Sequence, residues 1–170
     1  MFAEVLTANE MDFALVPVAA NGYQPVHAAV LLESLDRISD PLALVRKVHA
    51  QLASGGLLFV TALVSSGFDV EVLGLRNLYL YPPDRTNCFS LQGLSALLMN
   101  AGFALLEVST PGVLDVDIVR AHVERDQSIP LSSFERRLLQ SKPETQEAFQ
   151  MFLQQQALSS FARIVAQKLP

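Results

Sequence analysis

Residues 26–63 read VHAAVLLESLDRISDPLALVRKVHAQLASGGLLFVTAL, and this stretch decides the fold class. Its two ends, 26–32 and 57–63, are short and densely apolar, which is typical of buried strands. Between them, Asp40 can cap a helix that begins at Pro41, and apolar residues then recur at every fourth position. The stretch therefore predicts a strand, a helix and a second strand, with the two strands parallel.

The same alternation extends to both sides of this unit. The runs 12–18 (DFALVPV) and 103–110 (FALLEVST) are also strand-like. Gly55 and Gly56 can supply the left-handed conformation that ends the first helix, and Ser90 can cap a second helix. Units of this kind, joined by right-handed crossovers, form an α/β sheet covered by helices.

The last third of the chain has a different texture. Residues 112–158 contain three helix-like stretches, after which 159–169 (SSFARIVAQKL) returns to a strand pattern. A lone strand is not stable by itself, so it is expected to rejoin the sheet. The connection is far longer than the roughly two to five residues common in hairpin loops. We therefore predict a single domain over 1–170, in which 112–158 is a helical insertion or lid.

Composition excludes several classes of function. The 170 residues are 51% hydrophobic and carry a net charge of −5, which argues against binding dominated by nucleic-acid phosphates. One cysteine, Cys88, cannot form an intrachain disulfide or a cysteine-rich zinc site, and it is expected to be a small buried residue. The three histidines are His27, His49 and His122, and they lie far apart in the sequence. No metal site is therefore predicted. The N-terminus lacks the pattern of a signal peptide and no apolar run could span a membrane, so a cytoplasmic location is expected.

The chain resembles class I S-adenosylmethionine-dependent methyltransferases. Many members have a Glu-His pair after a strand, an Asp-Pro helix start and a Gly-Gly before the next strand, and the stretch 26–63 contains the Asp-Pro and the Gly-Gly. One subgroup continues with a Gly-Phe-Asp turn, a Tyr-Pro-Pro-Glu-His block and an Asn-x-Phe-Ser cap. This chain has GFD at 67–69, YPPDR at 81–85 and NCFS at 87–90. The resemblance implies a truncated Rossmann-like sheet, mostly parallel with an antiparallel last strand, and S-adenosylmethionine as the family's cofactor.

The departures from the family pattern concern its chemistry. The family holds its cofactor with a glycine-rich turn after the first strand and an acid after the second. This chain has no such turn, and we expect that the first two strands of the fold are absent from it. Asp36-Arg37 and Asp84-Arg85 stand where relatives have Glu-His. Arginine is a fixed cation, whereas histidine can transfer protons near neutral pH. We therefore expect that this chain alone does not bind the cofactor, and no catalytic base is assigned.

Candidate site residues cluster after the predicted strands, where an open α/β sheet binds ligands. Glu33 and Ser34 could form the floor of a cofactor pocket, or they could be a polar pair that caps a turn. Asp36 and Arg37 could form a local ion pair. The candidates for contacts with a substrate or partner are Arg37, Tyr79, Tyr81 and Arg85. The two tyrosines could instead pack over the sheet.

Three interpretations remain open. The chain can be the C-terminal portion of a methyltransferase, a non-catalytic relative that acts as a partner or dimerisation module, or part of a longer polypeptide. In the first two interpretations, the strand at 26–32 has an unpaired edge to which a partner strand can bind. We expect that edge to be covered by the strand at 12–18, by a second copy of the chain, or by an upstream methyltransferase fragment.

Overall fold

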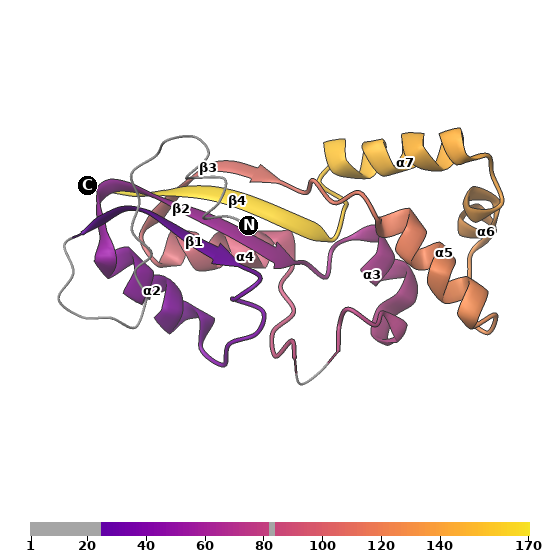
Figure 1. Cartoon of the computed structure of the whole chain (residues 1–170), viewed down its shortest axis with the longest axis horizontal. Helices are drawn as coiled ribbons and strands as arrows, with labels where there is room; N and C mark the ends of the chain where they lie inside the picture. The colour runs from indigo at the N-terminus through magenta and orange to yellow at the C-terminus, as the bar shows by residue number, and fades with distance from the viewer. Residues whose placement is uncertain (1–24, 82–83) are drawn as a thin grey trace, which may run out of the picture.

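The computed structural model describes residues 25–81 and 84–170. Within these ranges the chain forms a four-stranded sheet with helices at one face and at one end (Figure 1). The elements in chain order are β1 (Val26–Leu32), α2 (Pro41–Gln51), β2 (Leu52–Leu63), α3 (Phe68–Leu73), the 3-10 helix η1 (Gly74–Arg76), α4 (Leu91–Asn100), β3 (Phe103–Ser109), α5 (Asp115–Arg125), α6 (Ser133–Leu139), α7 (Pro143–Gln155) and β4 (Phe161–Lys168).

The strand order in the sheet is β1-β2-β4-β3. β1 and β2 are parallel, whereas β4 is antiparallel to both of its neighbours, so β1, β2 and β3 run in one direction and β4 runs against them. This confirms the predicted α/β sheet with an antiparallel last strand. It also confirms that the final strand rejoins the sheet after a long helical excursion. The strand expected at 12–18 lies outside the described residues.

Local signals explain where the helices of the sheet begin. The Asp40 carboxylate accepts a hydrogen bond from the Ala43 amide at 2.9 Å, and Pro41 takes the first helical position of α2. The Ser90 hydroxyl likewise accepts from the Gly93 amide at 3.0 Å and caps α4. Both predicted caps are therefore confirmed.

The end of α2 differs from the prediction. The helix stops at Gln51, and Gly55 and Gly56 lie within β2, where the register with β1 shifts. Gly55 has a φ of +73°, so its left-handed conformation forms this bulge rather than a helix cap. The ammonium group of Lys168 donates to the carbonyls of His49 and Leu52, each at 2.8 Å. A cation from β4 thus satisfies carbonyls at the end of α2, which makes a glycine cap unnecessary.

The main core lies between the sheet and α2 and α4, which cover the same face (Figure 1). Alternate residues of β2 and β4, including Leu58, Val60 and Ile164, are fully buried there. On the opposite face of β2, Phe59 is 37% exposed. β1 is also less buried than predicted, because Leu32 points to this second face and is exposed.

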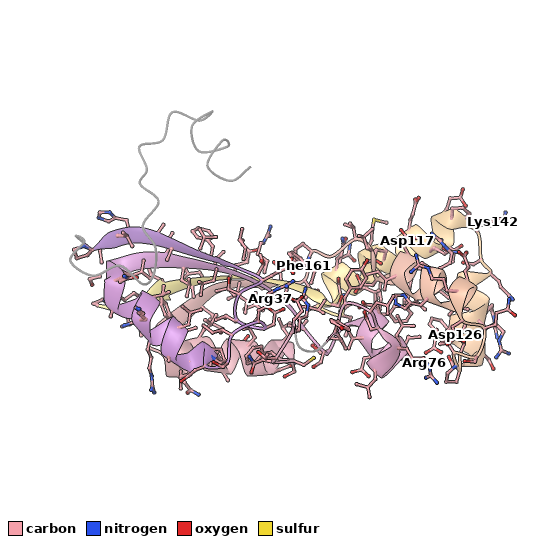
Figure 2. The ribbon with its side chains drawn as sticks, turned by 60° about the horizontal axis from the view of Figure 1, so that its bottom comes forward. Arg37, Arg76, Asp117, Asp126, Lys142 and Phe161 are labelled. Carbon is pink, nitrogen blue, oxygen red and sulfur yellow. The ribbon has the colours of Figure 1, made fainter. Side chains whose placement is uncertain are left out.

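The helices after β3 form a separate helical module, residues 112–158, at the carboxyl ends of β2 and β3 (Figure 1). A small core joins this module to α3. In it, the buried side chain of Leu73 from α3 packs with Val119 of α5 and with Ile129. In Figure 2, Arg37 and Phe161 lie near the junction of sheet and module, whereas Asp117 and Lys142 lie out on the helices.

Candidate functional site

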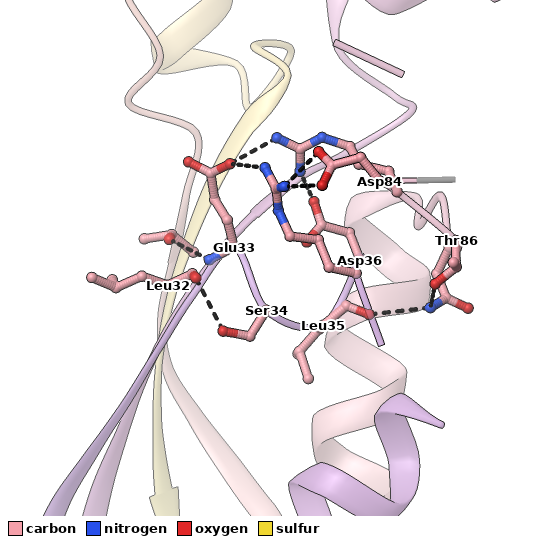
Figure 3. Close-up of polar contacts among 11 residues, drawn as sticks. Leu32, Glu33, Ser34, Leu35, Asp36, Asp84 and Thr86 are labelled. Atoms are coloured by element: carbon pink, nitrogen blue, oxygen red, sulfur yellow. Dashed lines mark hydrogen bonds and ion pairs between the residues drawn. The ribbon is translucent and has the colours of Figure 1, made fainter. Parts of the chain in front are cut away.

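The turn after β1 carries the first group of candidate residues (Figure 3). The Glu33 amide donates to the Thr61 carbonyl at 2.9 Å, so pairing with β2 continues one residue beyond β1. Glu33 adopts a φ of +46°, which is uncommon for a residue other than glycine. The Ser34 hydroxyl donates to the Leu32 carbonyl at 3.0 Å and thereby closes its own turn. Glu33 therefore projects its carboxylate from a constrained backbone, while Ser34 has a local role.

The two Asp-Arg pairs bind each other crosswise (Figure 3). The Arg85 guanidinium donates through Nη1 to Asp36 and through Nη2 to Glu33, the latter at 2.7 Å. The Arg37 guanidinium donates through Nη1 to both oxygens of Asp84 at 2.5 Å and through Nη2 to Glu33 at 3.5 Å. The expected local pair between Asp36 and Arg37 is wrong, because each residue takes its partner from the segment at 84–85.

The two crosswise pairs differ in burial. The side chains of Asp36 and Arg85 are 1% and 10% exposed, whereas those of Arg37 and Asp84 are 39% and 53% exposed. The inner pair is therefore shielded from water and the outer pair is not. Only one oxygen of Asp36 is engaged, and its Oδ1 finds no hydrogen-bond donor among the described residues.

Backbone contacts fasten the same two segments together. The amides of Thr86 and Asn87 donate to the Asp36 carbonyl at 2.8 and 3.0 Å. The side-chain amide of Asn87 donates to the carbonyls of Ile38 and Leu35, at 2.6 and 3.3 Å. The turn after β1 and the residues before α4 thus form one rigid unit.

The electrostatics of this unit favour the charged form of Glu33. Hydrogen bonds and charge from Arg85, and to a smaller extent from Arg37, lower the pKa of Glu33 below its ordinary value of 4.5. Three carboxylates face two guanidinium groups, and both arginines are already paired. Neither Arg37 nor Arg85 therefore has a free guanidinium group that could bind an anionic ligand through two parallel hydrogen bonds.

The predicted site residues divide into two groups. Glu33, Arg37 and Arg85 come together, but the rings of Tyr79 and Tyr81 are exposed. The Tyr81 carbonyl accepts a hydrogen bond from the Arg85 amide at 3.1 Å, so its contact with the network is through the backbone. The pairing of Asp36 and Asp84 with the arginines was not predicted. An Asp-Arg dipeptide stands at both positions where relatives have Glu-His, and this repetition could have indicated the pairing.

A second polar cluster was not predicted at all. It lies where β4 begins, beneath the helical module, and contains the buried carboxyl groups of Asp69 and Asp115. Asp69 lies in the stretch GFDV and Asp115 in the stretch VLDV, each among apolar residues. This pattern is the only signal of the cluster in the sequence. Cys88 is exposed, so the expectation that it is buried is wrong.

Gly67 and Gly112 are both closely packed against the start of β4. Gly67 lies between β2 and α3, at the ligand side of the sheet, but a Cβ atom there would lie 2.1 Å from Ser160 Cα. The space beside Gly112 is likewise taken by Ser159, whose Oγ would lie 2.2 Å from such an atom. The chain itself fills both positions.

The fold and the sequence together identify the class of protein. A sequence profile described as a methyltransferase domain matches residues 7–108. This chain belongs to that methyltransferase-domain family. The search of curated protein sequences gives no match.

Solved structures with the same fold include enzymes of different activities. The 4+2 cyclase SpnF is 19% identical, with a TM-score of 0.51 over 98% of this chain and 60% of that chain. A possible histamine N-methyltransferase from Thermotoga maritima is 14% identical, with a TM-score of 0.52 over 98% and 68%. Phosphoethanolamine N-methyltransferase 2 from Haemonchus contortus, bound to S-adenosylhomocysteine, is 14% identical, with a TM-score of 0.53 over 98% and 40%.

These likenesses establish a Rossmann-like methyltransferase fold. The chain spans between 40% and 68% of the length of the three proteins. S-adenosylmethionine is the cofactor of the family to which the chain is related, as the bound S-adenosylhomocysteine illustrates. None of the helices in the described ranges is long and apolar enough to cross a membrane.

Proposed function

We propose that this chain is the C-terminal portion of an S-adenosylmethionine-dependent methyltransferase, and that methyl transfer requires a further polypeptide segment that supplies the cofactor cradle. The observation that supports this proposal is the unpaired edge of β1 in the described part of the chain. In the described part of the chain β1 pairs only with β2, so its other edge offers unpaired backbone groups. A strand that docks there extends the sheet on its cofactor-binding side.

The open face of the sheet supports the same proposal. Val30, Phe59 and Val165 are opposite one another on three adjacent strands and form an apolar stripe on the face away from α2 and α4. No helix in the described ranges covers this stripe. A complementary segment that continues the sheet beyond β1 and packs helices on this face would bury it, which stabilises the complex through the hydrophobic effect.

Charge distribution limits where such a segment docks. Toward β3, the same face becomes polar, because Arg163 and Glu107 form an exposed ion pair at 2.7 Å. β3 also exposes the apolar residues Leu106 and Val108, so the ion pair interrupts the apolar surface without ending it. The complementary segment docks along β1, because the unpaired edge is there.

The test compares the chain alone with the chain plus the polypeptide encoded immediately upstream of Met1. Calorimetric titration with S-adenosylmethionine is expected to show binding only for the mixture, and labelled methyl transfer to a pool of acceptors should follow the same pattern. Micromolar binding by the chain alone, about −8 kcal/mol, or turnover by the chain alone, would overturn the proposal.

A pair of matched variants checks the docking surface. Phe59→Lys places a charge in the apolar stripe, whereas Leu106→Lys places one on β3, where Leu106 is already exposed. We expect the first variant to abolish complementation and the second to retain it, with both proteins folded by circular dichroism. Equal complementation by both variants would contradict docking on this face.

The second candidate function is a non-catalytic methyltransferase relative that acts as a partner or dimerisation module. The complete pairing of Arg37 and Arg85 favours it, since their charges are used within the chain. A folded, complemented complex that transfers no methyl group to any acceptor would select this alternative. Concentration-dependent self-association through the β1 edge would then indicate dimerisation.

A further inference from the structure

Helix α7 departs from the usual amphipathic pattern. Gln146 and Gln150 are each 8% exposed, whereas Met151 and Phe152 are 54% and 47% exposed. Among the large apolar side chains of the helix only Leu153 is fully buried. A surface helix ordinarily buries its apolar side chains and exposes its polar ones. Packing within the described chain therefore does not account for the apolar residues on the outside of α7.

The two buried glutamines hold α7 in this orientation. The Gln146 side-chain amide donates to two backbone carbonyls at and just after the end of α6, at 3.1 and 3.0 Å. The Gln150 side-chain oxygen accepts from the Val116 amide at 3.1 Å, and its nitrogen donates to the Gly112 carbonyl at 2.9 Å. A rotated helix would leave these buried groups without partners, which is costly. The hydrogen bonds of the glutamines thus keep the apolar residues of α7 on its outer side.

Four phenylalanine rings from α3, α6 and α7 form a connected series, which we call the aromatic row: Phe68, Phe134, Phe149 and Phe152. The Phe149 ring is at its centre. Its centroid lies 5.1 Å from that of Phe68 and 5.7 Å from that of Phe134, both edge-to-face. It lies 6.0 Å from the centroid of Phe152, in a stacked arrangement. Phe134 is 59% exposed and Phe152 nearly half exposed, so the row presents open ring surface.

The aromatic row begins at the edge of the sheet where ligands bind in this class of fold. Phe68 follows the carboxyl end of β2, and its amide donates to the Leu158 carbonyl at 2.9 Å, which joins α3 to the segment after α7. Open α/β sheets bind ligands beyond the carboxyl ends of their parallel strands. From Phe68 the row continues onto α6 and α7, and α7 itself leads back to the start of β4 (Figure 1).

We propose that the aromatic row binds an acceptor substrate with a flat, uncharged aromatic body, which packs on the exposed rings and directs its nucleophilic atom toward the Phe68 end. The four rings carry no charge and no hydrogen-bonding group. The row therefore selects by apolar area and by ring stacking, which adds to the energy of burial. This inference names the substrate class of the proposed methyltransferase and rests on that proposed function.

The first test is binding by the full chain without cofactor. 2-Naphthol is the aromatic probe, decahydro-2-naphthol is its saturated analogue, and glycerol is the polar comparison; nuclear magnetic resonance follows the phenylalanine ring signals. We expect saturable binding of 2-naphthol that shifts the signals of the aromatic row, weaker binding of the saturated analogue and no binding of glycerol. Shifts confined to Phe59, on the open face of the sheet, would overturn the proposal.

Matched variants locate the binding surface. Phe152→Ala removes an exposed ring of the aromatic row, whereas Met151→Ala removes a neighbouring side chain of similar exposure that lies outside the row. We expect Phe152→Ala to weaken the binding of 2-naphthol about tenfold and Met151→Ala to bind it as the wild type does. Phe134→Ala, at another exposed ring, replaces the first variant if that variant does not fold. Equal affinities of the ring variant and Met151→Ala would contradict the proposal.

The second test separates this inference from the proposed function. The chain complemented with its upstream segment is assayed for labelled methyl transfer to 2-naphthol and to glycine, and Phe152→Ala is expected to raise KM for 2-naphthol with little change in kcat. Turnover of glycine alone, unaffected by Phe152→Ala, would overturn the aromatic acceptor and leave the proposed function intact. Binding of 2-naphthol at the row without turnover of any acceptor would refute the methyltransferase and support the row as a binding site.

A second copy of the chain is the other occupant that the exposed rings could accept. Sedimentation of the full chain distinguishes it, because self-association through the row would be lost in Phe152→Ala and retained in Met151→Ala. That result would overturn the proposal. A monomer at all concentrations, with 2-naphthol bound at the row, supports it.

Discussion

Asp36 and Asp84 each precede an arginine in the sequence, yet each binds the arginine of the other pair. The crosswise arrangement joins two segments that are far apart in the chain. The inner pair, Asp36 with Arg85, is shielded from water, and without Asp36 the Arg85 guanidinium keeps only the partly exposed Glu33 as its counter-charge. The outer pair is exposed, where ion pairs contribute little to stability.

This difference predicts unequal effects for the same substitution. Asp36→Asn should lower the free energy of unfolding by about 3 kcal/mol, because Arg85 loses its buried counter-charge. Asp84→Asn, the matched control, should lower it by less than about 1 kcal/mol. Urea denaturation of the two variants measures both values. Equal losses would mean that the inner pair is not shielded as the structure indicates.

At the scale of secondary structure elements, the segment between β2 and α4 is fastened at two places. Its first part, with α3, joins the helical module through the small apolar core and through the Leu78 amide, which donates to His122 of α5. Its second part joins the turn after β1 through Asp84, Arg85 and the amides that follow them. This one segment therefore connects the module to the carboxyl end of β1.

The close approach of α3 to β4 gives a prediction for Gly67. An added Cβ atom would lie 2.1 Å from Ser160 Cα and 2.3 Å from its amide nitrogen, and backbone atoms cannot yield as a flexible side chain does. Gly67→Ala should lower the free energy of unfolding by roughly 1–3 kcal/mol or more. Gly93→Ala is the control, because a Cβ atom there meets only Ser90 Oγ at 3.2 Å. Thermal unfolding of both variants should show a large loss for Gly67→Ala alone.

At the scale of the whole molecule, two apolar cores of unequal size divide the stability. The sheet with α2 and α4 has an extensive buried core, whereas the helical module has a small one. Segments with fewer buried apolar contacts open with lower free energy. The helical module is thus expected to open while the sheet remains folded.

Core substitutions test this division. Leu98→Ala, in α4, should destabilise the entire chain by about 2–5 kcal/mol. Val119→Ala, in α5, should increase hydrogen exchange only in the module, since Val119 is fully buried in the smaller core. Native-state hydrogen exchange of both variants distinguishes the two effects. Faster exchange of β2 and β4 in Val119→Ala would show that the two cores unfold together.

The sequence by itself determined the strands and helices of the sheet and, through the family resemblance, their topology. Asp40 with Pro41 and the Ser90 cap act on amides within three residues, and strand patterns are equally local, so both can be read along the chain. Candidate residues Glu33, Arg37 and Arg85 were predicted to lie in segments that follow strands, and the structure brings their side chains together.

Only the tertiary structure decided the contacts that give these residues their properties. The crosswise pairing of Asp36 and Asp84, the glycine bulge opposite β1 and the hydrogen bonds of Asp115 with the residues before β4 all depend on which distant segments meet. Local patterns predict a helix cap or a strand, but they carry no information about partners dozens of residues away. Burial and proximity, which set charge and protonation, arise only when the chain has packed.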